Sequence, residues 1–483
     1  MAKLLTDFVL TSAYVYTGTF ADITGMSDTV SVKDTESVVI LMTSNVPAEN
    51  IVASLCVEYR FTVDGSPVGG ELSSMLDDND EFSGIEMMYA VTGLSAGNHT
   101  FAVQGRNRLG NGEVDTTRNR TFQVLELDFG SAEILVDLTS SSADTAPATW
   151  ADVAGLTTSA TPEAGSLLLF TAGLPPLSDE NDEMGDYQFA IDGVRDGPNL
   201  GSHNRRPDRT DSLSMSWAED GVSAASHTFS LQWEDRRREP ETDTTRTRYL
   251  QVIEIKKFFS LEIDNVSVAA DSAPAAFANM VGMSGNATID SLDSKALILA
   301  NYIQDSAGNQ KDRADSRLTV GGTFEGAEQA NLKRNADRTG STMMNRAADG
   351  ESGVTAFALQ WEQGLNTPNA DTGRNRTFQV IDLLTTAGQI EASADLVFSA
   401  TADLRAFGAL SASPAMVFAL TANLGDKQFI SASPAMVFDV AASIQDKQLI
   451  SAGPVMAFTL TADIRNGTPQ TENLSRHIDR FIN

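Results

Sequence analysis

A six-residue segment occurs three times in this chain, and successive copies start 128 residues apart. The copies are His99–Gln104, His227–Gln232 and Thr355–Gln360. A second segment follows each copy at the same spacing, beginning at Thr117, Thr245 and Gly373. A period this long is typical of a whole repeated domain and is too long for one rung of a solenoid. The sequence therefore predicts three copies of one domain, at residues 1–128, 129–256 and 257–384.

Each copy reads as an all-β domain. It contains about eight strand-like runs separated by Gly, Pro, Asp and Asn clusters, and it has no 3.6-residue apolar period. One alternating run in each copy leads into a Gly-containing turn, which predicts a β-hairpin. These runs are Phe61–Gly65, Phe189–Gly193 and Leu318–Gly322. A chain with this pattern is expected to form a β-sandwich or jelly roll of about 128 residues.

The order of these runs resembles the jelly-roll domains that are common in virion proteins of tailed bacteriophages. It is also similar to the tumour-necrosis-factor-like jelly roll. The resemblance covers residues 1–384 and rests on the pattern of strands and turns, so it carries over no catalytic residues. It implies a structural role in a virus particle.

The joints between the repeats are short. Leu125–Leu127 runs almost directly into the second repeat, and Ile253–Ile255 into the third. Such joints limit relative motion, unlike a Gly/Ser tether. Two arrangements are compatible with them: the repeats could line up as a rod, or they could close around an axis as a single-chain pseudo-trimer.

The pattern changes after residue 384, where a period of 20 residues begins. Four phenylalanines mark it: Phe398, Phe418, Phe438 and Phe458. A unit this short cannot bury its own core, so residues 385–466 are predicted to form a stack of four short β-repeats. The phenylalanines are expected to form its core, which could serve oligomerisation, as in a shaft of three intertwined chains, or anchoring. Residues 467–483 are predicted to be a polar tail whose end could form a short helix with one apolar face, which would either dock on a partner or fray at the terminus.

Composition restricts the partners. The chain has 34 basic and 65 acidic residues and a formal net charge of −31, which argues against binding nucleic acid. Cys56 is the one cysteine, so no disulfide framework is expected and assembly in a reducing cytoplasm is favoured. Asp7 interrupts the only signal-like start, and no apolar run is long enough for a membrane helix, so neither secretion nor membrane insertion is expected.

An acidic residue and an arginine recur at one spacing in each repeat. The pairs are Asp115 and Arg118, Asp243 and Arg246, and Asp371 and Arg374. We expect each pair to steady the loop that enters the closing strand. A second arginine follows each first one by two residues, which would place both on one strand face. Such an arginine cluster could instead bind sulfate or glycan carboxylates.

Other candidate chemistry is better explained structurally. His99 and His227 are replaced by Thr355 in the third repeat, which argues against a metal site. The acidic runs 77–81 and 179–183 lack the spacing of an EF-hand, so solvated loops are expected in preference to calcium sites. The sequence has no nucleophile elbow, phosphate-binding loop or dinucleotide fingerprint. We therefore expect no enzyme activity and no cofactor.

These observations favour a bacteriophage structural protein on the exterior of the virion, as a head decoration, a head fibre or a tail appendage. It would be made in the host cytoplasm, reside on the virion surface and contact other capsid or tail proteins, as a homotrimer or a single-chain pseudo-trimer. The alternative is an adhesin that recognises a host receptor or surface glycan. The aromatic residues to examine for that alternative are Trp217, Trp233 and Trp361.

Overall fold

The computed structural model contains two compact units, Met1–Leu384 (unit 1) and Thr385–Asn483 (unit 2). In unit 1 the structure describes residues 2–45, 47–48, 55–76, 84–110, 113–114, 116, 118–128, 130–175, 183–206, 209–210, 212–256, 259–289, 294–305, 312–333, 340–349 and 353–383. In unit 2 it describes the backbone of the eight strands between residues 390 and 464. Within these residues, no helix has the length and apolar character needed to cross a membrane.

Repeat 1 forms two four-stranded antiparallel sheets. The first has the order β1 (Ala2–Leu10), β10 (Arg120–Leu127), β3 (Val38–Asn45), β7 (Ile85–Val91). The second has the order β2 (Ala21–Val32), β8 (Gly97–Leu109), β5 (Leu55–Val63), β6 (Ser66–Leu76). Two short strands, β4 (Pro47–Ala48) and β9 (Glu113–Val114), pair beside them. Successive long strands thus lie in opposite sheets, except for β5 and β6, which are neighbours in the second sheet, and this is the topology of a jelly roll.

Repeats 2 and 3 have the same strand order. In repeat 2 the first sheet has the order β11 (Ala132–Ser140), β19 (Arg248–Ile255), β13 (Leu167–Leu174), β17 (Leu213–Glu219). The second has the order β12 (Ala151–Ala160), β18 (His227–Arg237), β14 (Glu183–Ile191), β15 (Val194–Arg206), β16 (Arg209–Thr210). In repeat 3 the first sheet has the order β20 (Phe259–Ser267), β28 (Arg376–Leu383), β22 (Lys295–Asp305), β25 (Gly340–Asp349), and the short strand β27 (Asn369–Ala370) also pairs with β22. The second has the order β21 (Ala278–Ile289), β26 (Gly353–Leu365), β23 (Asp312–Val320), β24 (Thr323–Lys333). The all-β, tandem jelly-roll prediction is confirmed.

The predicted hairpin is present in each repeat. In repeat 1 it joins β5 to β6, and its two turn residues, Asp64 and Gly65, both have positive φ angles, 49° and 78°. Gly321 and Gly322 take the same conformation between β23 and β24. Two positive φ angles define the turn type whose twist matches the flanking strands, which is why Asp-Gly and Gly-Gly occupy it.

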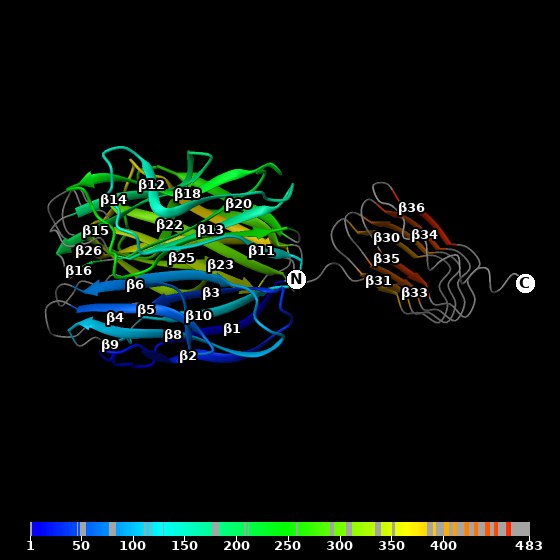
Figure 1. The fold of residues 1–483 in the computed structure, drawn as a ribbon, viewed down its shortest axis with the longest axis horizontal. Coiled ribbons are helices and arrows are strands. Elements are labelled where there is room, and N and C mark those ends of the chain that lie inside the picture. The colour runs from blue at the N-terminus through cyan, green and yellow to red at the C-terminus, as the bar shows by residue number, and fades with distance from the viewer. Residues whose placement is uncertain are drawn as a thin grey trace, which may run out of the picture. The chain divides into compact units, whose positions relative to one another are not determined.

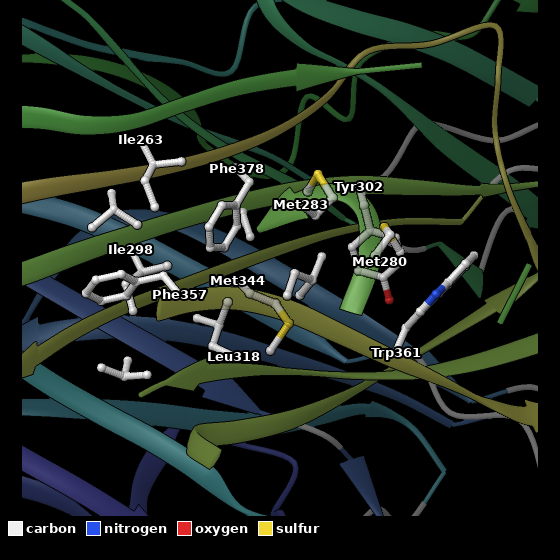
Figure 2. Packing of buried hydrophobic residues seen from close by; sticks show 14 of the residues in the cluster. Ile263, Met280, Met283, Ile298, Tyr302, Leu318, Met344, Phe357, Trp361 and Phe378 are labelled. Atoms are coloured by element: carbon white, nitrogen blue, oxygen red, sulfur yellow. The ribbon is translucent and has the colours of Figure 1, made fainter. Parts of the chain in front are cut away.

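Each sandwich encloses its own apolar core. Figure 2 shows the core of repeat 3, where Phe357, Phe378 and Met344 fill the space between the two sheets and Trp361 lies near Tyr302. The cores of repeats 1 and 2 are built from equivalent positions, with one addition each from a neighbouring repeat: Tyr249 of repeat 2 joins the core of repeat 1, and Ile303 of repeat 3 joins the core of repeat 2. In each repeat, the outermost strand of the second sheet has a few buried residues separated by exposed or partly exposed ones, as expected for a sheet with one solvated face.

A fourth core joins the three repeats. Its members come from the first sheet of every repeat and include Ile40, Leu169 and Leu299, all fully buried. The edge strands β7, β17 and β25 contact one another pairwise. In Figure 1 the blue strands of repeat 1 accordingly lie against the cyan to green strands of repeat 2 and the green to yellow strands of repeat 3. The repeats therefore close around a shared core, and the rod arrangement is wrong for unit 1.

The described strands of unit 2 form two parallel sheets. One contains β29 (Ile390–Ala392), β31 (Ala409–Ala412), β33 (Phe429–Ala432) and β35 (Leu449–Ala452). The other contains β30 (Ala400–Leu404), β32 (Leu420–Leu424), β34 (Val440–Ile444) and β36 (Leu460–Ile464). Each residue pairs with the residue 20 positions further on, as Leu420 does with Val440. The predicted stack is thus a parallel β-solenoid made by one chain. The four phenylalanines and the tail 467–483 lie outside the described residues.

Candidate functional site: the interfaces between the repeats

Three buried glutamines, Gln123, Gln251 and Gln379, link the repeats. They occupy equivalent positions on the closing strands β10, β19 and β28, each at most 1% exposed. Each side-chain amide makes two hydrogen bonds with the backbone of one alanine in another repeat. Gln251 Nε2 donates to the carbonyl of Ala90 (2.9 Å), and the Ala90 N–H donates to Gln251 Oε1 (2.8 Å). The amide thus satisfies an edge-strand residue as a further strand would.

The other two glutamines make the same contact. Gln379 clamps Ala218, with bonds of 2.6 and 2.8 Å, and Gln123 clamps Ala347, with bonds of 2.7 and 2.9 Å. Repeat 2 therefore reaches repeat 1, repeat 3 reaches repeat 2, and repeat 1 reaches repeat 3. Each interface joins two different surfaces, and the series closes after three steps.

An arginine contact runs around the ring in the same direction. Arg374 donates from Nη2 and Nε to Asp186 of repeat 2, at 2.9 and 3.1 Å. Arg246 donates to Glu58 of repeat 1, and Arg118 lies 3.3 Å from Asp315 of repeat 3. All three acidic residues are buried. Burial alone would lower the pKa of Arg374, but the carboxylates of Asp186 and Asp371 hold it above its ordinary value.

The acidic residues singled out by the sequence lie beside these arginines. Arg246 Nη1 is 3.3 Å from Asp243 Oδ2, and Arg374 contacts Asp371 through Nη1. Asp115 lies outside the described residues. In repeats 2 and 3 each arginine is therefore held between a local aspartate and an acidic residue of the neighbouring repeat.

The second arginine of each repeat has a different role. Arg120, Arg248 and Arg376 are fully buried within their own repeats, and Arg248 donates to the carbonyls of Ser142 and Ala154 at 2.7 and 2.8 Å. Burial lowers the pKa of all three. The expectation that both arginines share one strand face is wrong, because the first arginine precedes the closing strand and faces another repeat. Neither arginine is placed to act as a shared anion site.

The histidines support hairpin turns. His99 Nδ1 lies 2.6 Å from Asp64, and His227 Nδ1 lies 2.7 Å from Asp192, where each aspartate is the first turn residue. The Thr100 backbone N–H and then His99 lower the pKa of Asp64. Gly321 takes the place of the aspartate in repeat 3, which explains why Thr355 replaces the histidine there. The contact is structural.

The remaining candidate residues also belong to the interior. Trp217, Trp233 and Trp361 are at most 2% exposed and line the sandwich cores, so they do not form an aromatic surface for a glycan. Cys56 is buried. In the part of the chain that the structure describes, no group of three or more His, Cys, Asp or Glu side chains could hold a metal ion. Both acidic runs fall outside that part, apart from buried Glu183.

Sequence reasoning missed the glutamine clamp and its acidic counterpart. The signal was present: a glutamine stands between apolar residues at one position of every closing strand, as in Phe122-Gln123-Val124. Glu58, Asp186 and Asp315 likewise recur at one position of the fourth long strand of each repeat. A polar residue retained inside an apolar strand indicates a buried hydrogen-bonding partner.

Comparison with known proteins does not assign this chain to a family. No family model matches the chain, and no curated protein matches it. Solved structures give distant matches. PNGF-II has 9% identity and a TM-score of 0.24, covering 69% of this chain and 98% of that one. A structure described as the triple jelly roll fold and turret assembly in an archaeal virus has 10% identity and a TM-score of 0.19, covering 79% and 89%. At these values the matches assign neither family nor function to this chain.

Proposed function

We propose that this chain is a structural protein on the exterior of a bacteriophage particle, serving as a head decoration, a head fibre or a tail appendage. The observation that carries the proposal is the closed ring of three jelly rolls around one core. Its recurring polar residues are used to hold the ring together, which suits a rigid part that is built into a larger assembly.

The second unit fits the same role. A β-solenoid formed by one chain is an extended surface of stacked strands, and such surfaces suit attachment to a partner. We propose that unit 2 contacts another capsid or tail protein and that unit 1 faces outward. The formal charge of −31 suits an outer surface and disfavours packing against the genome.

The test is to purify particles of the virus that encodes this chain and to probe them with antibodies against unit 1. We expect the chain to co-purify with intact particles and the antibodies to bind them without disruption. A virus encoding the chain truncated after Leu384 should yield particles that lack it, while a Glu36→Gln virus, altered at one exposed side chain, should retain it. Recovery of the full chain only in particle-free fractions would contradict the proposal, and particles that keep the truncated chain would contradict the assigned attachment.

A separate binding experiment tests the alternative, in which the chain is an adhesin. None of the tryptophans named for it is exposed. Binding of the purified chain to host cells that lack the virus, competed by isolated surface glycan, would replace the structural proposal with this alternative.

A further inference from the structure

The three interfaces differ at one set of equivalent positions. Asp7, Asp137 and Asp264 lie on the first strand of each repeat, each directly opposite the clamping glutamine of its own closing strand. The residue that precedes the clamped alanine is Tyr89, Trp217 or Arg346. These two sets of positions meet across the three interfaces between repeats. Each interface forms a seam, and the chemistry of the two sets can be compared for each seam in turn.

Two of the three seams have a favourable contact. Arg346 of repeat 3 donates two hydrogen bonds to the carboxylate of Asp7, both 2.9 Å long. The hydroxyl of Tyr89 lies 3.2 Å from Asp137 Oδ1. At the seam between repeats 2 and 3 the corresponding residue is Trp217, which brings neither a cation nor a hydroxyl to Asp264.

That seam contains an extra carboxyl group instead. Glu219 follows the clamped Ala218 directly and is half-buried. Repeat 1 has Val91 at this position and repeat 3 has Ala348, so the acid is particular to repeat 2. Among the described residues, no lysine or arginine forms an ion pair with Glu219 or Asp264.

The groups that face Glu219 are acidic or neutral. Asp196 approaches from β15, Asp264 from β20 of repeat 3, and Asp220 follows it in the chain. The neighbour on β13 is Leu168, and β28 presents the neutral Gln379, which donates to Asp264. Arg195 of β15 is turned to the ring of Trp150, 4.7 Å away. Burial, followed by these carboxylates, raises the pKa of Glu219 to about 7.

We propose that the seam between repeats 2 and 3 is a pH-sensitive joint, which is held more tightly when Glu219 is protonated and loosened when it ionises. When the seam opens, Glu219 gains solvent and moves away from Asp264. Its pKa then falls towards the ordinary value of 4.5, although Asp196 and Asp220 of the same repeat stay beside it. The closed seam therefore binds a proton that the open seam releases between about pH 4.5 and pH 7. Below this range Glu219 is protonated whether the seam is open or closed, so it has no effect on closure. Its unfavourable effect on closure grows as pH rises through the range and is complete above pH 7.

A second buried acid must be separated from this effect. Glu86 accepts a hydrogen bond from the Asn345 N–H (2.7 Å) at the seam between repeats 1 and 3, and burial raises its pKa. A global melting curve would combine both carboxyls. A local measurement is needed, and the ring provides one, because the Ala218 N–H donates across the seam in question.

The experiment is amide hydrogen exchange of the full chain, resolved to Ala90, Ala218 and Ala347 and corrected for intrinsic exchange rates. Between about pH 5.5 and pH 8.5, the protection of Ala218 should fall several-fold, with roughly 30-fold as the upper bound if opening returns the pKa of Glu219 fully to its ordinary value, while the protection of Ala90 should stay constant. In Glu219→Gln the protection of Ala218 should be independent of pH. Glu36→Gln, altered at an exposed acid, should behave as the unaltered chain.

Two results would overturn the proposal. One is an Ala218 protection that does not change with pH in the unaltered chain, and the other is a pH dependence that survives in Glu219→Gln. If that variant does not fold, Glu219→Val supplies the side chain that repeat 1 carries at this position and tests the same point. The joint belongs to the ring itself, so the result of this experiment does not depend on the proposed virion role.

Discussion

At the scale of single residues, two kinds of side-chain contact hold the ring together. Neutral glutamine amides bond the backbone of a neighbouring repeat, and charged arginines bond its buried carboxylates. A glutamine amide has one donor and one acceptor side, so it matches both backbone groups of a strand residue without the desolvation penalty of an ion. Buried Arg–carboxylate contacts are costlier to desolvate. Once such a contact has formed, removal of one partner is strongly destabilising, because the other charge remains buried without compensation. The two contacts therefore fail differently when they are altered.

Gln251→Leu should destabilise the chain by about 2–4 kcal/mol, because the N–H and carbonyl of Ala90 would be left buried without partners. The measurement is the free energy of unfolding in urea. Gln232→Leu is the matched control, since Gln232 lies in the same repeat but bonds Asp152 on the exposed outer sheet. It should cost less than about 1 kcal/mol. Equal losses for the two variants would contradict the clamp.

Arg246→Met should cost about 3 kcal/mol, because Glu58 would remain buried with only its contacts to repeat 1 arginines, such as Arg106 at 2.5 Å. Chemical denaturation of the full chain provides the value. Arg195→Met, at an exposed arginine stacked on Trp150, should change stability by less than about 1 kcal/mol. A neutral effect of Arg246→Met would show that this buried contact contributes nothing to ring closure.

At the scale of strands, the sequence was informative wherever local chemistry decides the structure. Positive-φ turns require Gly or Asp, so the hairpin at Asp64-Gly65 could be predicted, and so could the alternating strands. The 20-residue period predicted the stack of short β-repeats. The pairing direction and partner choice could not be predicted, because a short apolar strand pairs equally well within one chain or between chains until its turns fix the register.

The solenoid register gives a prediction about length. Deleting residues 425–444 removes β33 and β34, so β31 would meet β35 and β32 would meet β36 in the same register. We expect unit 2 to stay folded, because every remaining strand keeps an equivalent neighbour. Deleting residues 425–434 should instead unfold it, because strands of the two sheets would then face each other out of order. Limited proteolysis of the full chain distinguishes the two, and equal resistance would contradict the parallel register.

At the scale of the whole molecule, short joints alone could not decide between a rod and a ring. The signal that favours a ring was the continuous apolar character of strands such as Val38–Met42, since a sheet that is buried on both faces reads this way. In the ring, β3 is buried along its whole length because one face lines its own sandwich and the other the shared core. The polar contacts across the seams were beyond prediction, because they depend on which repeat each edge strand meets.

Closure of the ring is tested most directly by a contact between its first and last repeats, since repeats adjacent in sequence would touch in a rod as well. Asp7 and Arg346 form such a contact. A double-mutant cycle with Asp7→Asn, Arg346→Gln and the double variant, read out as free energies of unfolding, measures their coupling. Because Asp7 is one-third exposed, we expect about 1 kcal/mol. A coupling of zero would mean that repeats 1 and 3 do not meet and would contradict the closed pseudo-trimer.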